Sequence, residues 1–141
     1  MMASPSRFLV LAVFCASTAL NAFAWICFSS VYTLVLRRYA ATAWQINALS
    51  LTYMLAYLPA SVASAWVSSR YGLRGSLVLG ASFNVACTWI RYGGDRLADP
   101  ATAYGVVLFG QLLGAIGQPL LLNAPARIAS DWFPATERDL A

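Results

Sequence analysis

Four long stretches without a charged residue constrain this chain more than any other feature. They cover Phe8–Leu36, Tyr39–Ser69, Gly75–Ile90 and Ala101–Ala126. A helix needs about 20 apolar residues to cross the hydrocarbon core of a bilayer, within a range of 17–25. Three stretches are long enough, and neighbouring apolar residues extend the third. We therefore predict an all-α membrane protein with four transmembrane helices, at 8–36, 46–69, 74–92 and 101–127.

The composition agrees with a membrane protein and excludes several other classes. Hydrophobic residues make up 60% of the 141 residues and charged residues 10%, with a mean hydropathy of +0.66. A soluble domain carries about 25% charged residues. The lipid bilayer is thus the expected partner, and a disordered chain, a nucleic-acid-binding module and a soluble globule are excluded. The net charge of +4 comes from Arg residues that flank the apolar stretches, as is typical of membrane helices.

Residues for catalysis or metal binding are scarce. The chain has no His, and its three cysteines, Cys15, Cys27 and Cys87, lie inside apolar stretches. Their spacing fits neither a metal site nor a disulfide framework. We interpret them as small apolar residues. We expect no cofactor and no metal, and because no nucleophile–base pair is present we expect that the protein is not an enzyme.

Short connections join the four predicted helices. They lie at 39–45, 70–74 and 93–100, and Asp99–Pro100 reads as a turn before the last helix. Links this short place consecutive helices antiparallel, in an up-and-down bundle. Five Arg residues fall on the side of the N-terminus and four on the other side, which favours a cytoplasmic N-terminus.

The N-terminus allows a second interpretation. Arg7, the apolar run Phe8–Leu20 and the tripeptide Ala22-Phe23-Ala24 resemble a secretory signal peptide with its cleavage site. The apolar stretch continues to Leu36 without a polar break, which favours an uncleaved first helix.

Polar residues within the helices are the candidate site residues, because polar groups are costly in lipid. Asn21 and Trp25 lie on one stripe of the first helix, and packing between helices is the alternative role for both. On the fourth helix, Gln111, Gly114 and Gln118 share one face, and Gln118 precedes a proline near mid-span. The candidate substrate-binding residues are Trp25, Gln118 and Asn21.

Two motifs resemble the major facilitator superfamily. Ser69–Arg74 (SRYGLR) is similar to the cytoplasmic D-R-x-G-R-R loop, although Ser69 stands in place of the acid and Leu73 in place of a base. The segment from Arg127 to Arg138 resembles the R-x-x-x-x-W-F-P-x-x-E-R elbow. The resemblance implies the first four helices of a twelve-helix fold, with Arg70, Gly72 and Arg74 in conformational coupling. Arg residues at a membrane edge also simply anchor helices.

A narrower resemblance is to the feline leukaemia virus subgroup C receptor-related transporters. It rests on four segments: NAFAWI at 21–26, YMLAYLP at 53–59, YGLR at 71–74 and GQP at 117–119 with its continuation APARIAS at 124–130. The resemblance implies the N-terminal third of a transporter of choline and ethanolamine or of haem, lacking its C-terminal half. It also implies that Trp25 contributes to a cage for the cation and that Gln118 is a polar contact.

Three functions remain open from the sequence. The first is transport of choline-like organic cations by alternating access, and the second is haem transport by the same fold. The third is a truncated membrane protein that does not transport, because four helices cannot form two halves around a central site. We expect an integral multi-pass protein of the plasma membrane.

Overall fold

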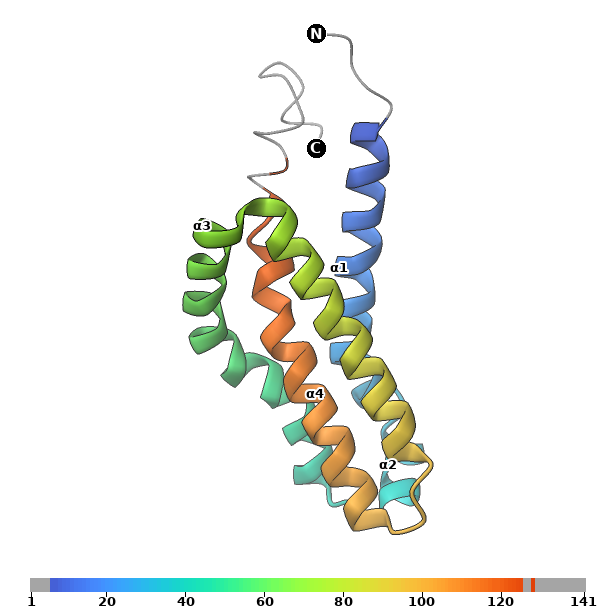
Figure 1. Cartoon of the computed structure of the whole chain (residues 1–141). Coiled ribbons are helices and arrows are strands. Elements are labelled where there is room, and N and C mark those ends of the chain that lie inside the picture. Colours follow the sequence, from blue (N-terminus) through green and yellow to red (C-terminus); the bar gives the residue numbers. More distant parts are fainter. Residues whose placement is uncertain (1–5, 126–127, 129–141) are drawn as a thin grey trace, which may run out of the picture.

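The computed structural model describes residues 6–125 and residue 128, and all regular structure in that part is helical. The helices are α1 (Ser6–Ser30), α2 (Tyr32–Tyr39), α3 (Ala43–Asp95) and α4 (Pro100–Leu122). In Figure 1, α1 descends, the first half of α3 rises, its second half descends and α4 rises again. The predicted all-α, up-and-down arrangement is confirmed.

Three helices, α1, α3 and α4, are long and apolar enough to cross a membrane. α3 has 53 residues, which at 1.5 Å per residue is about 80 Å of helix. The hydrocarbon core is about 30 Å thick. α3 therefore supplies two passes, and the chain has the four predicted transmembrane segments.

A single glycine reverses the direction of α3. Gly72 has φ 69° and ψ −175°, and residues on both sides of it are helical. A side chain disfavours this positive φ, so the position suits glycine. The prediction of two helices separated by a connection at 70–74 is corrected here, because the helices reach Gly72 from both sides and the turn is shorter than expected (Figure 1).

The first predicted span, 8–36, is also corrected. α1 ends at Ser30, and Val31 has φ −111° and ψ 34° before α2 begins at Tyr32. The break lies in the run Ser29–Thr33, which consists of serine, β-branched and aromatic residues that favour helix weakly. α1 is continuous through Ala22–Ala24, the tripeptide that resembles a cleavage site.

Side-chain caps set the starts of the later helices. Thr42 and Gln45 form a capping box, so α3 starts at Ala43 rather than at 46. The Asp99 side chain accepts a hydrogen bond from the Thr102 amide and Pro100 is the first helical residue, so the predicted Asp99–Pro100 turn is confirmed. α4 ends at Leu122, earlier than the predicted residue 127.

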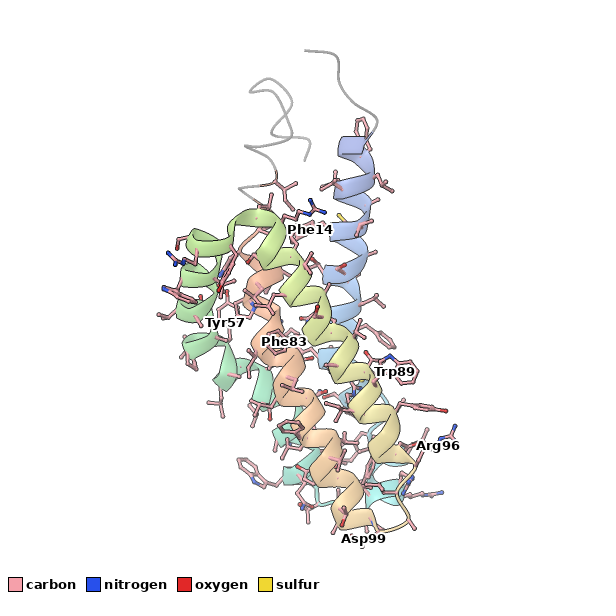
Figure 2. All side chains as sticks on the ribbon, in the orientation of Figure 1. Phe14, Tyr57, Phe83, Trp89, Arg96 and Asp99 are labelled. Carbon is pink, nitrogen blue, oxygen red and sulfur yellow. The ribbon has the colours of Figure 1, made fainter. Side chains whose placement is uncertain are left out.

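Small residues let α4 approach α3 closely. A Cβ on Gly117 would lie 2.6 Å from the Cβ of Phe83, which Figure 2 labels on α3 beside α4, and a Cβ on Gly110 would lie 2.9 Å from Cγ of Arg91. Close backbone approach of this kind is how helices associate in lipid. About half of the most apolar part of α4 is accordingly buried inside the bundle, whereas only 6% of that of α1 is.

Candidate functional site: the polar contacts between α1 and its neighbours

Trp25 lies on α1 against the first half of α3. Its ring stacks on that of Tyr53, with centroids 6.4 Å apart and planes at 28°. Its indole Nε1 donates a hydrogen bond to the carbonyl oxygen of Ser50 at 3.2 Å. The residue is 36% exposed. Its polar atom is therefore already paired, and what it presents to its surroundings is part of an aromatic ring.

Asn21, one turn before Trp25, lies in the interior with 2% exposure. Its Nδ2 donates to Oδ1 of Asn84 at 2.6 Å and to the Gly114 carbonyl at 3.1 Å. Asn84 in turn donates to the Ser17 carbonyl. The amide of Asn21 is thus engaged with α3 and α4, and not on the exposed face that Trp25 presents.

Gln118 is half-buried on α4 and no hydrogen bond joins its side chain to another described residue. Its height relative to Trp25 follows from the contact between Asn21 and Gly114. Trp25 is four residues beyond Asn21, and Gln118 is four residues beyond Gly114 on an antiparallel helix. The two candidates are therefore about 12 Å apart along the helix axes, and the structure does not bring them into contact.

Gln111 shares a face of α4 with Gln118 and lies level with Trp25, although it was not among the candidate substrate-binding residues. Gln111 is fully buried, and its Nε2 donates to the carbonyl oxygen of Ala24 at 3.3 Å. Its position on the face of Gln118 was visible in the sequence. Gln111 and Gln118 are about two helical turns apart on α4. Which residue of α1 each of them meets depends on how α1 packs against α4, which the sequence does not show.

Arg91 points into the bundle. Its Nη1 donates to the Ala24 carbonyl at 3.1 Å, its Nη2 lies 2.6 Å from Sγ of Cys27, and its Cζ lies 4.4 Å from the centroid of the Phe28 ring. Arg91 flanks the apolar stretch Gly75–Ile90, and its side chain turns toward α1. The signal was the spacing of Asn84, Cys87 and Arg91, which places all three on one helix face.

The cysteines at this site have polar neighbours. Cys27 and Cys87 both lie beside the Arg91 guanidinium, with Cys87 Sγ 3.9 Å from Nη1. The interpretation of both as merely apolar residues is therefore incomplete. Cys15 is exposed on α1.

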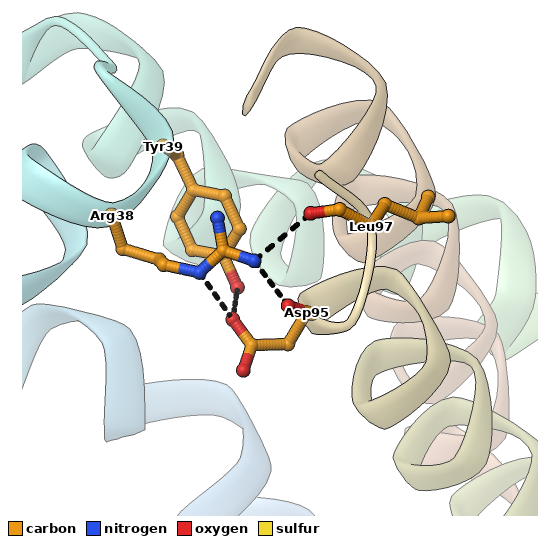
Figure 3. Close-up of polar contacts among 4 residues, drawn as sticks. All are labelled: Arg38, Tyr39, Asp95 and Leu97. Carbon is orange, nitrogen blue, oxygen red and sulfur yellow. Dashed lines mark hydrogen bonds and ion pairs between the residues drawn. The ribbon is translucent and has the colours of Figure 1, made fainter. Parts of the chain in front are cut away.

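Below this region, a second cluster fixes the short helix α2 (Figure 3). Arg38 pairs with Asp95 at 3.2 Å and donates to the carbonyls of Asp95 and Leu97. The Tyr39 hydroxyl donates to Asp95 Oδ1 at 3.0 Å. Burial, and then this hydrogen bond, raise the pKa of Tyr39 to about 12. α2 is thus attached to the end of α3.

The proposed coupling residues lie at the opposite end of the bundle, around the reversal of α3. Arg70 and Arg74 are exposed on either side of Gly72. The elbow motif from Arg127 to Arg138 lies outside the described residues apart from Ile128, which is buried against Phe14 and Ala124.

Known proteins resemble this chain over nearly its whole length. The choline/ethanolamine transporter FLVCR2 of Rattus norvegicus is 34% identical over 134 residues, which cover 95% of this chain and 24% of that protein. FLVCR1 of Mus musculus, also a choline/ethanolamine transporter, is 34% identical over 95% of this chain and 23% of its own length. Solute carrier family 49 member A3 of Danio rerio is 35% identical over 96% of this chain and 29% of its own length.

This chain therefore spans about a quarter of the length of these relatives. The sequence model of the Major Facilitator Superfamily matches residues 14–141, which is most of the chain. Together with four antiparallel transmembrane segments in an all-α fold, this match establishes that the chain belongs to the Major Facilitator Superfamily.

Proposed function

We propose that this chain is the N-terminal third of a plasma-membrane transporter that moves choline- or ethanolamine-like organic cations by alternating access. Its relatives are named transporters and solute carriers, and it aligns with about a quarter of their length. Four transmembrane helices do not make two halves around a central site. The C-terminal half of the site would come from the remainder of the protein.

The observation that carries this proposal is the environment of Trp25. Its indole N–H is satisfied by Ser50, one neighbour of its ring is Tyr53, and a third of the residue is exposed. Trp25 lies level with Gln111, halfway along α4, and so away from the interface that Trp prefers. An exposed indole ring in low dielectric attracts an organic cation, with a gain of about 2 kcal/mol or more when the cation is desolvated.

Gln118 would bind the polar end of the same substrate. The separation from Trp25 is about 12 Å along the helix axes. A substrate that contacts both residues must therefore extend along the bundle, with its cationic end at the Trp25 ring and its hydroxyl end at Gln118, as an amino alcohol can. Gln118 has no competing hydrogen bond within the described part of the chain.

Asn21 would support the site without contacting the substrate. Its amide bonds to Asn84 and Gly114 hold α1 against α3 and α4 one turn from Trp25. Arg70, Gly72 and Arg74 would couple the movement of the second and third transmembrane segments to the rest of the transporter, because they form the exposed turn between them.

Uptake by cells that express the full-length gene tests the proposal. Labelled choline should accumulate above the level of vector controls, and a fluorescent haem analogue should not. Uptake of the haem analogue alone would identify haem as the cargo. A stop codon directly after Ala141, with no uptake of either compound, would instead indicate a membrane protein that does not transport.

A further inference from the structure

Two helices converge on one backbone oxygen next to Trp25. The carbonyl of Ala24 accepts hydrogen bonds from Nη1 of Arg91 on α3, at 3.1 Å, and from Nε2 of Gln111 on α4, at 3.3 Å. Sγ of Cys27 on α1 lies 3.4 Å from the same oxygen. The carbonyl immediately precedes Trp25 in the chain, so these contacts act on the peptide that carries the indole ring.

Polar contacts matter more for α1 than for the other helices. α1 buries little of its surface in the bundle, and apolar contact gives helices no hydrophobic driving force in lipid. Hydrogen bonds join α1 to α3 and α4 in each turn from Ser17 onward, at Ser17, Asn21, Ala24, Trp25, Cys27 and Ser29. Those on Ala24 act on the peptide bond that joins Ala24 to Trp25.

Arg91 is held in place without a carboxylate. No Asp or Glu forms an ion pair with it among the residues described, and its guanidinium instead lies beside Cys27 and over the Phe28 ring. Both belong to the last turn of α1. The Ala24 carbonyl, the Cys27 sulfur and the face of the Phe28 ring thus receive the charge of Arg91, which favours one position of α1 relative to α3.

We propose that Arg91 and Gln111 are positioning residues that fix the Trp25 ring through the Ala24 carbonyl. This inference rests on the proposed function only in assuming that Trp25 binds the substrate cation. Arg91 supplies a charged donor from α3 and Gln111 a neutral donor from α4, so α1 is tied to both helices at one point. Loss of either donor removes one of the two contacts that set the rotation of α1 at the level of Ala24, and a small rotation there shifts the Trp25 ring relative to Tyr53 and Ser50.

Fluorine NMR of the full-length protein labelled with 5-fluorotryptophan tests the positioning directly. Trp25→Phe assigns the Trp25 resonance. In Arg91→Lys and in Gln111→Leu we expect this resonance to shift or broaden, while the other tryptophan resonances stay in place. Arg96→Gln is the matched control, because Arg96 is exposed and contacts Tyr92 instead of α1; it should leave the Trp25 resonance unchanged.

Both variants are designed to fold. Lys keeps the positive charge at position 91 but cannot reproduce the fork of donors. Leu at position 111 removes the donor together with Oε1, which has no partner in the described part of the chain, so no buried polar atom is left behind. Choline affinity should fall about fivefold in each variant, as expected for the loss of one hydrogen bond, and stay unchanged in Arg96→Gln.

The two proposals fail in different ways. If the Trp25 resonance is the same in Arg91→Lys, Gln111→Leu and the unmutated protein, the positioning role is wrong. If the resonance moves in both variants while Trp25→Ala leaves choline affinity unchanged, the positioning role holds and the assignment of Trp25 to the substrate site is wrong.

Discussion

The ring of Trp25 lies 6.4 Å from that of Tyr53, centroid to centroid, and the two planes are 28° apart. The two rings come from different transmembrane segments, and the hydroxyl of Tyr53 is buried on the far side, next to Gly114. The pair therefore forms an aromatic surface backed by the interior of the bundle, with Trp25 as its exposed part.

Trp25→Ala should weaken choline binding by the full-length transporter about thirtyfold. This corresponds to about 2 kcal/mol for a desolvated cation–π contact. Trp25→Phe should lose less, because phenylalanine retains a weaker quadrupole. Binding is measured with radiolabelled choline on purified protein. An uncharged analogue of choline should bind poorly, and its affinity should not change in Trp25→Ala. If choline affinity is unchanged in Trp25→Ala, the ring only packs against its neighbours and does not bind the substrate.

Arg74→Ala should slow transport with little effect on binding. Arg74 is exposed beside the reversal of α3, far along the bundle from Trp25. In full-length protein, we expect the maximal rate to fall several-fold while KM stays within about twofold, the pattern of a residue that acts on conversion and not on recognition. Initial rates of choline uptake provide both values. A rise in KM with an unchanged maximal rate would count against a coupling role.

The turn at Gly72 should be cytoplasmic. Gly72 and the loop before Pro100 lie at opposite ends of the bundle (Figure 1), and a cytoplasmic N-terminus puts the Gly72 end inside. Single cysteines introduced as Ser69→Cys and Ala98→Cys, in a background without native cysteines, report the orientation. An impermeant maleimide added to intact cells should label position 98 only. Labelling of position 69 under those conditions would reverse the topology.

Gly72→Ala should destabilise the protein by roughly 1–3 kcal/mol, because φ 69° with ψ −175° is a backbone conformation that essentially only glycine adopts. Nothing lies within 4 Å of a Cβ built at this position, so the cost comes from the backbone and not from a clash. Gly93→Ala is the control: it has equal space, lies within α3 and has no positive φ. It should be neutral or stabilising by up to about 1 kcal/mol. Thermal unfolding in detergent compares the two, and equal melting temperatures would show that the reversal carries no strain.

Acid should loosen the start of α4. Hydrogen bonds from the Thr102 side chain and then from its amide lower the pKa of Asp99. A carboxyl with a lowered folded-state pKa stabilises the fold above its unfolded pKa, and this contribution disappears as the pH falls through the folded value. The melting temperature should therefore fall at acidic pH by more in the unmutated protein than in Asp99→Asn, which keeps a neutral cap. Parallel pH profiles for the two proteins would argue against a role for this carboxylate.

The four transmembrane segments could be predicted because uncharged length alone fixes them. The ends could not, since they depend on local geometry: Val31 stops α1 inside an apolar run, and Gly72 turns the chain without a loop. At the site, the inward stripe with Asn21 and Trp25 could be predicted from helical spacing, and Asn21 is indeed buried. The spacing of Asn84, Cys87 and Arg91 indicated that these residues share one helix face, but that this face packs against α1 could not be predicted, because it depends on where Cys27 and Phe28 lie.

The reversal at Gly72 also limits how the second and third transmembrane segments can move. A turn one residue long contains no spare chain, so neither segment can slide along the other by even one helical turn. The two are free to tilt together about the hairpin end, and movement of one carries the other. In a transporter that exposes its site alternately to two sides, these two segments would therefore move as one pair.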